Sequence, residues 1–259
     1  MAHTKRNIVL LIWGVLLLSG IAYLVFKNAS NKTISPRDWP EIEADGVLNI
    51  VTEYNSVDYY VSGDSIAGRQ YDLCQYIEKR SGLKVKIFLE NNLENCIQNL
   101  KNNTCDIIAL NIPITNEGKK ELAFTVPITQ NKQVLIQRKP KTENDTLIRN
   151  QLDLAYKTIY ISKNSPCILR LHNLSEEIAE PIYIKEVEDY SQEQLLSMVA
   201  YQEIDYAVVD KGIAVKNEKL FPEIDMKTDI SFTQLQAWAV RQNAPVLLDS
   251  LNRWISERR

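Results

Sequence analysis

The sequence predicts an α/β protein of two similar lobes that follows one N-terminal transmembrane helix. From residue 47 onward, apolar strand-like runs alternate with amphipathic helical segments, the pattern of parallel sheets built from βαβ units. The alternation pauses at a polar passage, Lys139 to Asp145, and then begins again, so two lobes are expected. The transmembrane helix is predicted from Ile8 to Phe26, an uncharged and mostly apolar run of about the length that crosses a bilayer.

The N-terminal segment sets the expected location. Lys5 and Arg6 precede the apolar run, and positive charge before a span keeps the N-terminus in the cytoplasm. This predicts residues 1–27 as a single-pass anchor in the inner (cytoplasmic) membrane, with the globular part in the periplasm. A cleaved signal peptide with small residues before the cut is the alternative that stays open. Residues 28–45, polar and with two prolines, are expected to form a linker.

The first lobe is predicted from apolar runs and apolar helix faces. Its elements are strand, helix, strand, helix and strand, at 47–52, 70–82, 85–90, 93–100 and 106–110. The first helix stops at Ser81-Gly82, a usual C-terminal signal. In the second helix the apolar residues recur at i, i+3, i+4 and i+7: Leu93, Cys96, Ile97 and Leu100.

The second lobe repeats the alternation, with strands at 157–162, 181–187 and 206–210. Ser165-Pro166 is typical of an N-cap followed by a first-turn proline. Ser191 to Gln194 is a capping box that opens a further helix. The chain closes with a strand and a helix whose apolar stripe is formed by Leu247, Leu248, Leu251, Trp254 and Ile255.

Composition excludes several classes of function. The net charge of the 259 residues is −3 with mixed signs, so no basic surface for nucleic acid is expected. P-loop, GxGxxG and HExxH spacings are absent, so neither a cofactor nor a metal is expected. The four cysteines also lack the CxxC spacing of a zinc site and are interpreted as small buried hydrophobes. A disulfide between Cys96 and Cys105 is the alternative in an exported domain.

Candidate site residues follow from the position of the strands. Ligands of open parallel sheets bind at the carboxyl ends of the strands, where helix N-termini offer free N–H groups. The rule selects residues from both lobes, so a small-molecule cleft between the lobes is predicted. The selected residues are Thr52 to Tyr54, Asn111 to Thr115, Ser162 to Ser165, and Asp210. The competing interpretation is that Thr115 and Ser165 only cap helices and that Asp210 only starts a turn.

Catalytic chemistry has little support, so no catalytic residue is expected. His3 and His172 are the only histidines, and His3 precedes the apolar run. A catalytic triad would therefore depend on His172, which lies in a predicted helix and is interpreted as a surface residue.

Four stretches of the sequence carry a family resemblance: "GVLNIVTEYN", "IAGRQYDLCQYIEKRSGLKVKIF", "LKNNTCDIIALNIPITNEGKKELAFTVPI" and "YQEIDYAVVDKGIA". In their order and spacing, over residues 46 to 258, the sequence resembles the type II periplasmic solute-binding proteins, in the amino-acid-binding group of family 3. The stretch "NIPIT…FTVPI…KQVLIQRK" is more similar still to the solute-binding-like module of membrane-bound lytic transglycosylase F. Those enzymes append a catalytic domain whose glutamate precedes a serine, and no Glu-Ser dipeptide occurs here, so the enzyme half is expected to be absent.

The resemblance implies a Venus-flytrap fold like that of the periplasmic binding proteins. Lobe 1 would comprise residues 46–136 and 230–259, and lobe 2 residues 137–229. In lobe 1, Tyr54 would face the ligand, and backbone and hydroxyl contacts would come from Asn111, Pro113 and Thr115. In lobe 2, the hydroxyls of Ser162 and Ser165 would contact an anionic group of the ligand, and Asp210 would pair with an ammonium group.

One position departs from the family pattern. In amino-acid binders the third residue after the threonine is usually an arginine that clamps the α-carboxylate, and here it is Gly118. Lysines replace a bidentate arginine poorly, and Lys119 and Lys120 are interpreted as a solvated helix face. Arg69 or Lys163 are the alternatives for a positive charge. A free α-amino acid is therefore not required as the ligand.

The function implied is that of a membrane-anchored periplasmic protein that captures a small polar solute such as an amino acid, a peptide or a muropeptide-like fragment. Its partner would be an ABC permease or a cell-wall enzyme. Alternatives are a regulatory or interaction module in peptidoglycan turnover, or an enzyme on the same scaffold, such as a dehydratase, using Glu53 or Asp210 as acid or base.

Overall fold

The computed structural model describes residues 37–258 except 143–144, 164 and 189. The predicted membrane helix and residues 28–36 of the predicted linker lie outside these ranges. Among the residues that are described, no helix is long and apolar enough to cross a membrane.

The first lobe is built on a mixed sheet with the strand order β4-β1-β5-β13-β6, and β7 also pairs with β13. Strands β4, β1 and β5 run parallel, whereas β13 is antiparallel to β5, β6 and β7. The strands are β1 (Val47–Thr52), β4 (Lys84–Leu89), β5 (Ile107–Pro113), β6 (Leu122–Phe124), β7 (Thr129–Asn131) and β13 (Gln234–Arg241). The helices are α2 (Trp39–Asp45), α3 (Arg69–Ser81), α4 (Leu93–Lys101), the 3-10 turn η1 (Gly118–Lys120) and α8 (Pro245–Arg258). A hairpin of β2 (Tyr60–Ser62) and β3 (Ser65–Ala67) precedes α3.

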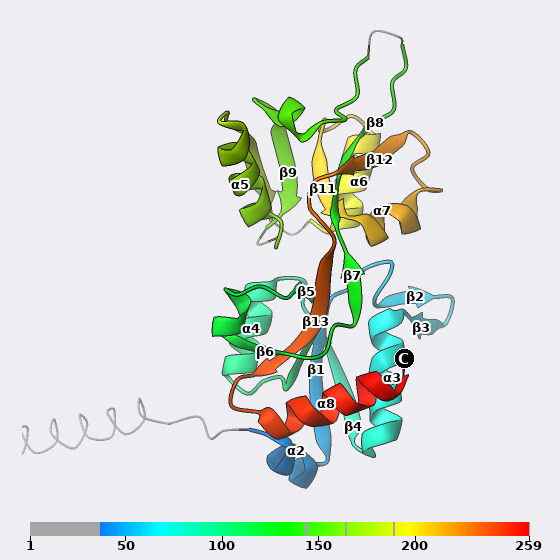
Figure 1. Cartoon of the computed structure of the whole chain (residues 1–259). Coiled ribbons are helices and arrows are strands. Elements are labelled where there is room, and N and C mark those ends of the chain that lie inside the picture. Colours follow the sequence, from blue (N-terminus) through cyan, green and yellow to red (C-terminus); the bar gives the residue numbers. More distant parts are fainter. Residues whose placement is uncertain (1–36, 143–144, 164, 189, 259) are drawn as a thin grey trace, which may run out of the picture. The chain divides into compact units, whose positions relative to one another are not determined.

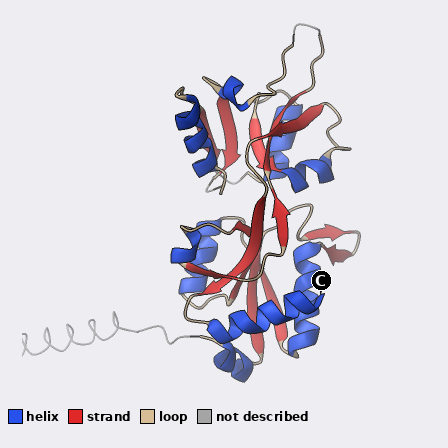
Figure 2. Cartoon of the chain, viewed as in Figure 1, coloured by secondary structure: helices blue, strands red, loops and turns tan. Residues whose placement is uncertain are grey.

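The second lobe has a five-stranded sheet in the order β10-β9-β11-β8-β12. Its strands are β8 (Gln133–Arg138), β9 (Thr158–Ser162), β10 (Tyr183–Val187), β11 (Ala207–Asp210) and β12 (Ile224–Asp229). Its helices are the 3-10 turn η2 (Gln151–Leu154), α5 (Ile168–Ile178), α6 (Gln192–Ala200) and α7 (Lys211–Asn217). Helices flank the strands of both sheets (Figure 2), so each lobe has its own apolar core on the two faces of its sheet.

Two segments connect the lobes, one from β7 to β8 and one from β12 to β13 (Figure 1). They are hydrogen-bonded to each other where they cross, since the Ile230 N–H donates to the Gln133 carbonyl over 2.9 Å. The Gln133 N–H in turn donates to the Ser231 hydroxyl, also over 2.9 Å. A pair of short crossing segments is the usual form of a hinge between lobes.

The interpretation of residues 28–45 as a linker is wrong for its last part. Trp39–Asp45 form helix α2, because Asp38 and Glu41 complete a capping box at its start and Gly46 takes a left-handed φ of 69° at its end. Ile42 is fully buried in the core of the first lobe. The Trp39 ring packs edge-on against Trp254 of α8 with 5.3 Å between the ring centroids.

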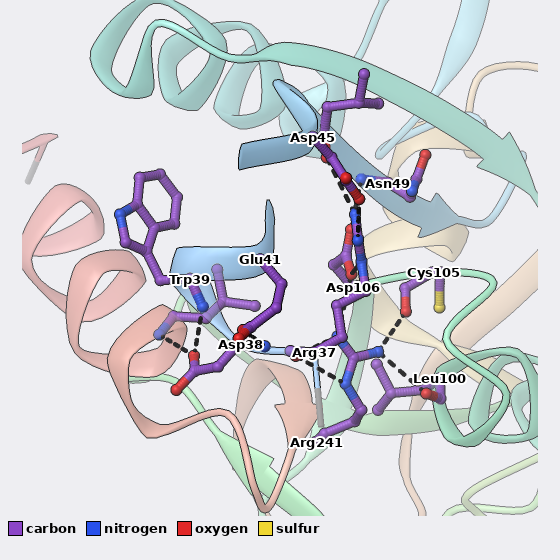
Figure 3. Close-up of polar contacts among 12 residues, drawn as sticks. Arg37, Asp38, Trp39, Glu41, Asp45, Asn49, Leu100, Cys105, Asp106 and Arg241 are labelled. Carbon is purple, nitrogen blue, oxygen red and sulfur yellow. Dashed lines mark hydrogen bonds and ion pairs between the residues drawn. The ribbon is translucent and has the colours of Figure 1, made fainter. Parts of the chain in front are cut away.

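A buried ionic cluster holds the start of this segment against the sheet (Figure 3). Asp106, which is fully buried, accepts hydrogen bonds from Arg37 Nε at 2.8 Å and from Arg241 Nη2 at 3.0 Å. Its second oxygen accepts from the Asn49 N–H over 3.0 Å. Arg241 also donates to the carbonyls of Leu100 and Cys105. The cluster therefore joins α2, β1, β13 and the loop before β5.

The remaining local predictions have mixed outcomes. The capping box at Ser191 and the stop of α3 at Gly82, with a φ of 73°, are confirmed. The predicted cap at Ser165-Pro166 is wrong, because α5 begins at Ile168 and its N-cap is Cys167. Thr115 is followed only by the short turn η1 rather than by a longer helix.

Candidate functional site

A cavity of about 100 Å³ lies between the carboxyl ends of β1 and β5 in the first lobe and those of β9 and β11 in the second. It adjoins a wider groove of about 510 Å³ that shares part of its lining. Eight of the residues selected from the sequence line the cavity: Glu53, Tyr54, Asn111, Ile112, Ser162, Lys163, Ser165 and Asp210. The sheet-edge rule thus brings together residues from both lobes, and their role as ligand contacts stays a prediction.

Three of the predicted contact residues lie outside the lining of this cavity. Pro113 is buried in β5, opposite Gln236 of β13. The Thr115 hydroxyl accepts the Gly118 N–H over 2.9 Å, so it serves the local turn. Arg69 is engaged in an ion pair with Asp58 and also donates to Thr129 over 2.9 Å.

A polar network fixes Asn111 at the floor of the cleft. The Asn111 amide donates to Asp58 Oδ2 over 2.6 Å, and its oxygen accepts from Gln70 Nε2 at 2.9 Å and from Arg69 at 3.2 Å. Gln70, which is fully buried, accepts from the Trp238 indole N–H over 2.5 Å. Because each member is held by another, the Asn111 side chain is oriented before any solute arrives.

The cleft is rich in carboxylates whose pKa values are raised. Desolvation by the surrounding walls raises the pKa of Glu53 to about 8, with further contributions from the charges of Asp58, Asp210 and Glu193. Desolvation also raises the pKa of Asp210 to about 6, although a hydrogen bond from Gln133 opposes the shift. The two carboxyl groups come from opposite lobes, and each is destabilised in its charged form.

Glu193 is a lining residue that the sequence did not single out. An acidic residue in the first turn of α6 is already explained by the helix dipole, and nothing in the local pattern indicates a second role for Glu193. In the structure its carboxylate accepts the Ser56 N–H at 2.8 Å and the Ser56 hydroxyl at 2.9 Å across the cleft. Asn217 of α7 also donates to the Ser56 hydroxyl over 2.9 Å. These contacts join the loop after β1 to the second lobe.

The thiols do not form a disulfide. Cys74, Cys96, Cys105 and Cys167 are all free and buried, which confirms their interpretation as small hydrophobic residues. Burial raises the pKa values of all four, to about 12 for Cys105, so they are unreactive near neutral pH. No group of His, Cys, Asp and Glu within the described ranges is arranged to hold a metal ion.

The structure leaves little room for a side chain at position 118. A Cβ built on Gly118 would lie 3.0 Å from Cζ of Phe124, whose partly buried ring packs against the core of the first lobe. Lys119 and Lys120 are exposed, which confirms that they form a solvated face. The phenyl ring therefore occupies space that a side chain at position 118 needs.

Introducing the family arginine, Gly118→Arg, is expected to lower the free energy of unfolding by about 1–3 kcal/mol, because the new side chain overpacks against Phe124. Urea denaturation measures the change. The double variant Gly118→Arg/Phe124→Ala is the control. In the Gly118→Arg background, Phe124→Ala should lower the free energy of unfolding by less than it does in the parent chain, because it also removes the clash. Equal midpoints for Gly118→Arg and the parent chain would contradict the steric explanation.

Comparison with known proteins places the chain among extracellular binding proteins. The family model of bacterial extracellular solute-binding proteins, family 3, matches residues 48–259. Membrane-bound lytic murein transglycosylase F of Desulfosudis oleivorans is 27% identical over 255 residues, which are 98% of this chain and 53% of the relative. The transglycosylase F of Saccharophagus degradans is 25% identical over 243 residues, 93% of this chain and 47% of the relative. The chain spans about half the length of these curated relatives.

Solved structures with the same fold include the holo arginine-binding protein ArgBP from T. maritima. It has a TM-score of 0.72 at 23% identity, with 85% of this chain and 93% of that chain covered. The ancestral amino acid-binding protein AncCDT-1, a precursor of cyclohexadienyl dehydratase, has a TM-score of 0.70 at 20% identity, with 84% and 92% covered. These likenesses confirm the predicted two-lobed α/β binding-protein fold and, at such identities, nothing finer.

Proposed function

The chain belongs to family 3 of the bacterial extracellular solute-binding proteins, and from this membership we propose that it captures a small polar solute between its two lobes. The observation that carries the proposal is the cavity lined from both lobes by residues at the ends of β1, β5, β9 and β11. The apolar run at Ile8 to Phe26 supports an anchor in the inner membrane with the globular part in the periplasm.

Capture works through closure of the lobes around the solute. The crossing segments near Gln133 and Ile230 allow one lobe to turn against the other, while Ser56 and Glu193 join the lobes at the cleft. A solute that contacts both walls favours the closed arrangement by the difference between its affinities for the closed and open forms.

Two roles for the closed form can be tested. Delivery to an ABC permease is one use of such a lobe movement. The other is a regulatory or interaction role in peptidoglycan turnover, and it is favoured by the curated relatives named membrane-bound lytic murein transglycosylase F. Cross-linking in cells distinguishes the two, because a permease or a cell-wall enzyme should be captured, and only the closed form should give the cross-link.

Solute binding is tested by thermal-shift screening and calorimetry of the full chain in mild detergent, with amino acids, short peptides and muropeptides. We expect a saturable rise in Tm with at least one class, and we expect Asp210→Ala to weaken that binding by about tenfold or more, since a buried charge contact is worth roughly 1.5–3 kcal/mol. Asp205→Ala, which removes an exposed carboxylate of the same lobe, is the matched control. Failure of every compound to stabilise the chain contradicts the proposal.

A further inference from the structure

The side chains that line the cavity include more acidic than basic groups. Glu53, Glu193 and Asp210 line the cavity. The one cationic side chain in the described lining, Lys163, is ion-paired with Glu188 over 2.5 Å. Within the described residues no ion pair joins Glu53 or Asp210 to a basic side chain, so both carboxyl groups can pair with a cationic group of a solute.

The positive groups that a carboxylate-bearing solute would need are engaged elsewhere. The Arg69 guanidinium directs Nε and Nη2 to Asp58 Oδ1 at 3.1 Å and 2.8 Å, so its fork of N–H donors is engaged by a carboxylate outside the lining. Position 118 has no side chain, and Phe124 fills the space beside it. A solute carboxylate in this cavity would therefore face carboxylates without a compensating fork of N–H donors.

A second observation indicates that the cavity wall is built for a bound molecule. The Ser162 hydroxyl, which lines both the cavity and the adjoining groove, is out of reach of solvent and has no hydrogen-bond partner within the described part of the chain. A buried polar atom without a partner is costly, and an N–H donor of a solute would satisfy it.

We infer that the solute is a small organic cation with two ammonium groups, held between Glu53 of the first lobe and Asp210 of the second, and that it needs no carboxylate. This rests on the proposed function. In the empty cleft the charge of Asp210 disfavours ionisation of Glu53 across the lobes. A dication between them attracts both carboxylates once Glu53 gives up its proton, so binding and closure of the lobes are coupled.

Binding of a dication also has a consequence for pH dependence. Asp58, Asp210 and Glu193 all act on Glu53 as negative charges, while Asn55 donates a hydrogen bond that opposes their effect. With a pKa of about 8, Glu53 is largely protonated in the empty cleft near neutral pH. Alkyl ammonium groups keep their protons there because their pKa is about 10.4. The dication needs the ionised Glu53 carboxylate, so its binding should displace one proton. Because the pKa of Glu53 is about 8, the affinity for the dication should rise from about pH 6 to about pH 8.

The test compares, by calorimetry on the full protein, three compounds that share a five-carbon aminoalkyl chain. Cadaverine has two amines, L-lysine adds a carboxylate to it, and ε-aminocaproate lacks one amine of lysine. We expect cadaverine to bind at least as tightly as lysine, and ε-aminocaproate to bind about a hundredfold more weakly, which corresponds to roughly 2.7 kcal/mol. Titrations in buffers of different ionisation enthalpy should report release of a proton with cadaverine.

Two substitutions test whether Glu53 and Asp210 are the groups that bind cadaverine. Glu53→Gln and Asp210→Asn keep the shape of the side chains and should each weaken cadaverine binding by about tenfold or more. Glu53→Gln should also reduce the rise in affinity with pH to the smaller part that ionisation of Asp210 contributes. Glu43→Gln, which changes an exposed carboxylate on α2, is the control.

Tighter binding of lysine or ε-aminocaproate than of cadaverine, or cadaverine binding that both cleft variants leave unchanged, overturns the inference while solute capture stands. Stabilisation by neutral or anionic solutes alone overturns it in the same way. Absence of binding by these probes and by the wider screen instead removes the proposed function itself.

Discussion

Replacing Asp106 with alanine is expected to lower the free energy of unfolding by about 3–5 kcal/mol, because it leaves the buried Arg241 guanidinium without its counter-charge and removes one of the two carboxylates that pair with Arg37. Arg37 Nε and Arg241 Nη2 both donate to Asp106 Oδ1, at 2.8 Å and 3.0 Å (Figure 3). The alanine also leaves the Asn49 N–H without its acceptor. Chemical denaturation followed by circular dichroism measures the loss.

The matched control is Glu121→Ala, which removes the exposed partner of Lys101 at 3.4 Å. Exposed ion pairs contribute between about 0 and 1 kcal/mol, so this variant should denature almost as the parent does. A second comparison tests the cause: Asp106→Ala combined with Arg241→Met should cost less than the sum of the two single changes, since the second substitution removes one unpaired charge. Additive costs would show that the ionic contact is not the source of the effect.

The fold was predictable because its signals are local. Alternating apolar strands and amphipathic helices depend on burial of one face, and burial in each lobe follows that pattern, as with Leu73, Cys74 and Ile77 on the inner face of α3. Helix α2 was missed because its seven residues bury little more than Ile42, and its stability comes from capping and from contacts with residues some two hundred positions away, such as Trp254. Such long-range partners leave no periodic trace in the segment itself.

The candidate site was predictable only where sheet geometry fixes it. Tyr54, Asn111 and Asp210 lie at or just beyond the carboxyl ends of strands that must meet at one edge, so the rule for parallel sheets was enough to bring them to one cavity. The position of Arg69 depends instead on the fold of the loop at Asp58, which no spacing in the sequence encodes. The role of Glu193 across the cleft depends on how the two lobes meet. Contacts of this kind depend on the three-dimensional arrangement of distant segments and cannot be predicted from the local sequence.

The loop at Asp58 also accounts for a glycine whose substitution should affect both stability and the cleft. Gly68 has a φ of 132° and a ψ of 156°, a region that side-chain-bearing residues rarely adopt. This conformation lets the backbone at Gly68 lie directly against the backbone of Asp58. Backbone carbonyls can then cap the start of α3, which has no side-chain cap. The Asp58 carbonyl accepts the N–H groups of Gln70 and Tyr71 at 3.0 Å and 3.2 Å.

Gly68→Ala is therefore expected to lower the free energy of unfolding by roughly 3 kcal/mol or more, since backbone strain and overpacking each cost about 1–3 kcal/mol. Its Cβ would lie 2.2 Å from the Asp58 carbonyl oxygen, a backbone atom that can withdraw only if the loop moves. That movement would separate Asp58 from Arg69 and Asn111, so solute affinity should fall as well. Gly212→Ala, in helix α7 and with no atom within 4 Å of the added Cβ, is the control and should be neutral or stabilising by up to about 1 kcal/mol. Urea denaturation and calorimetry on both variants separate the two effects, and a Gly68→Ala chain as stable as the parent would show that the loop at Asp58 adapts without cost.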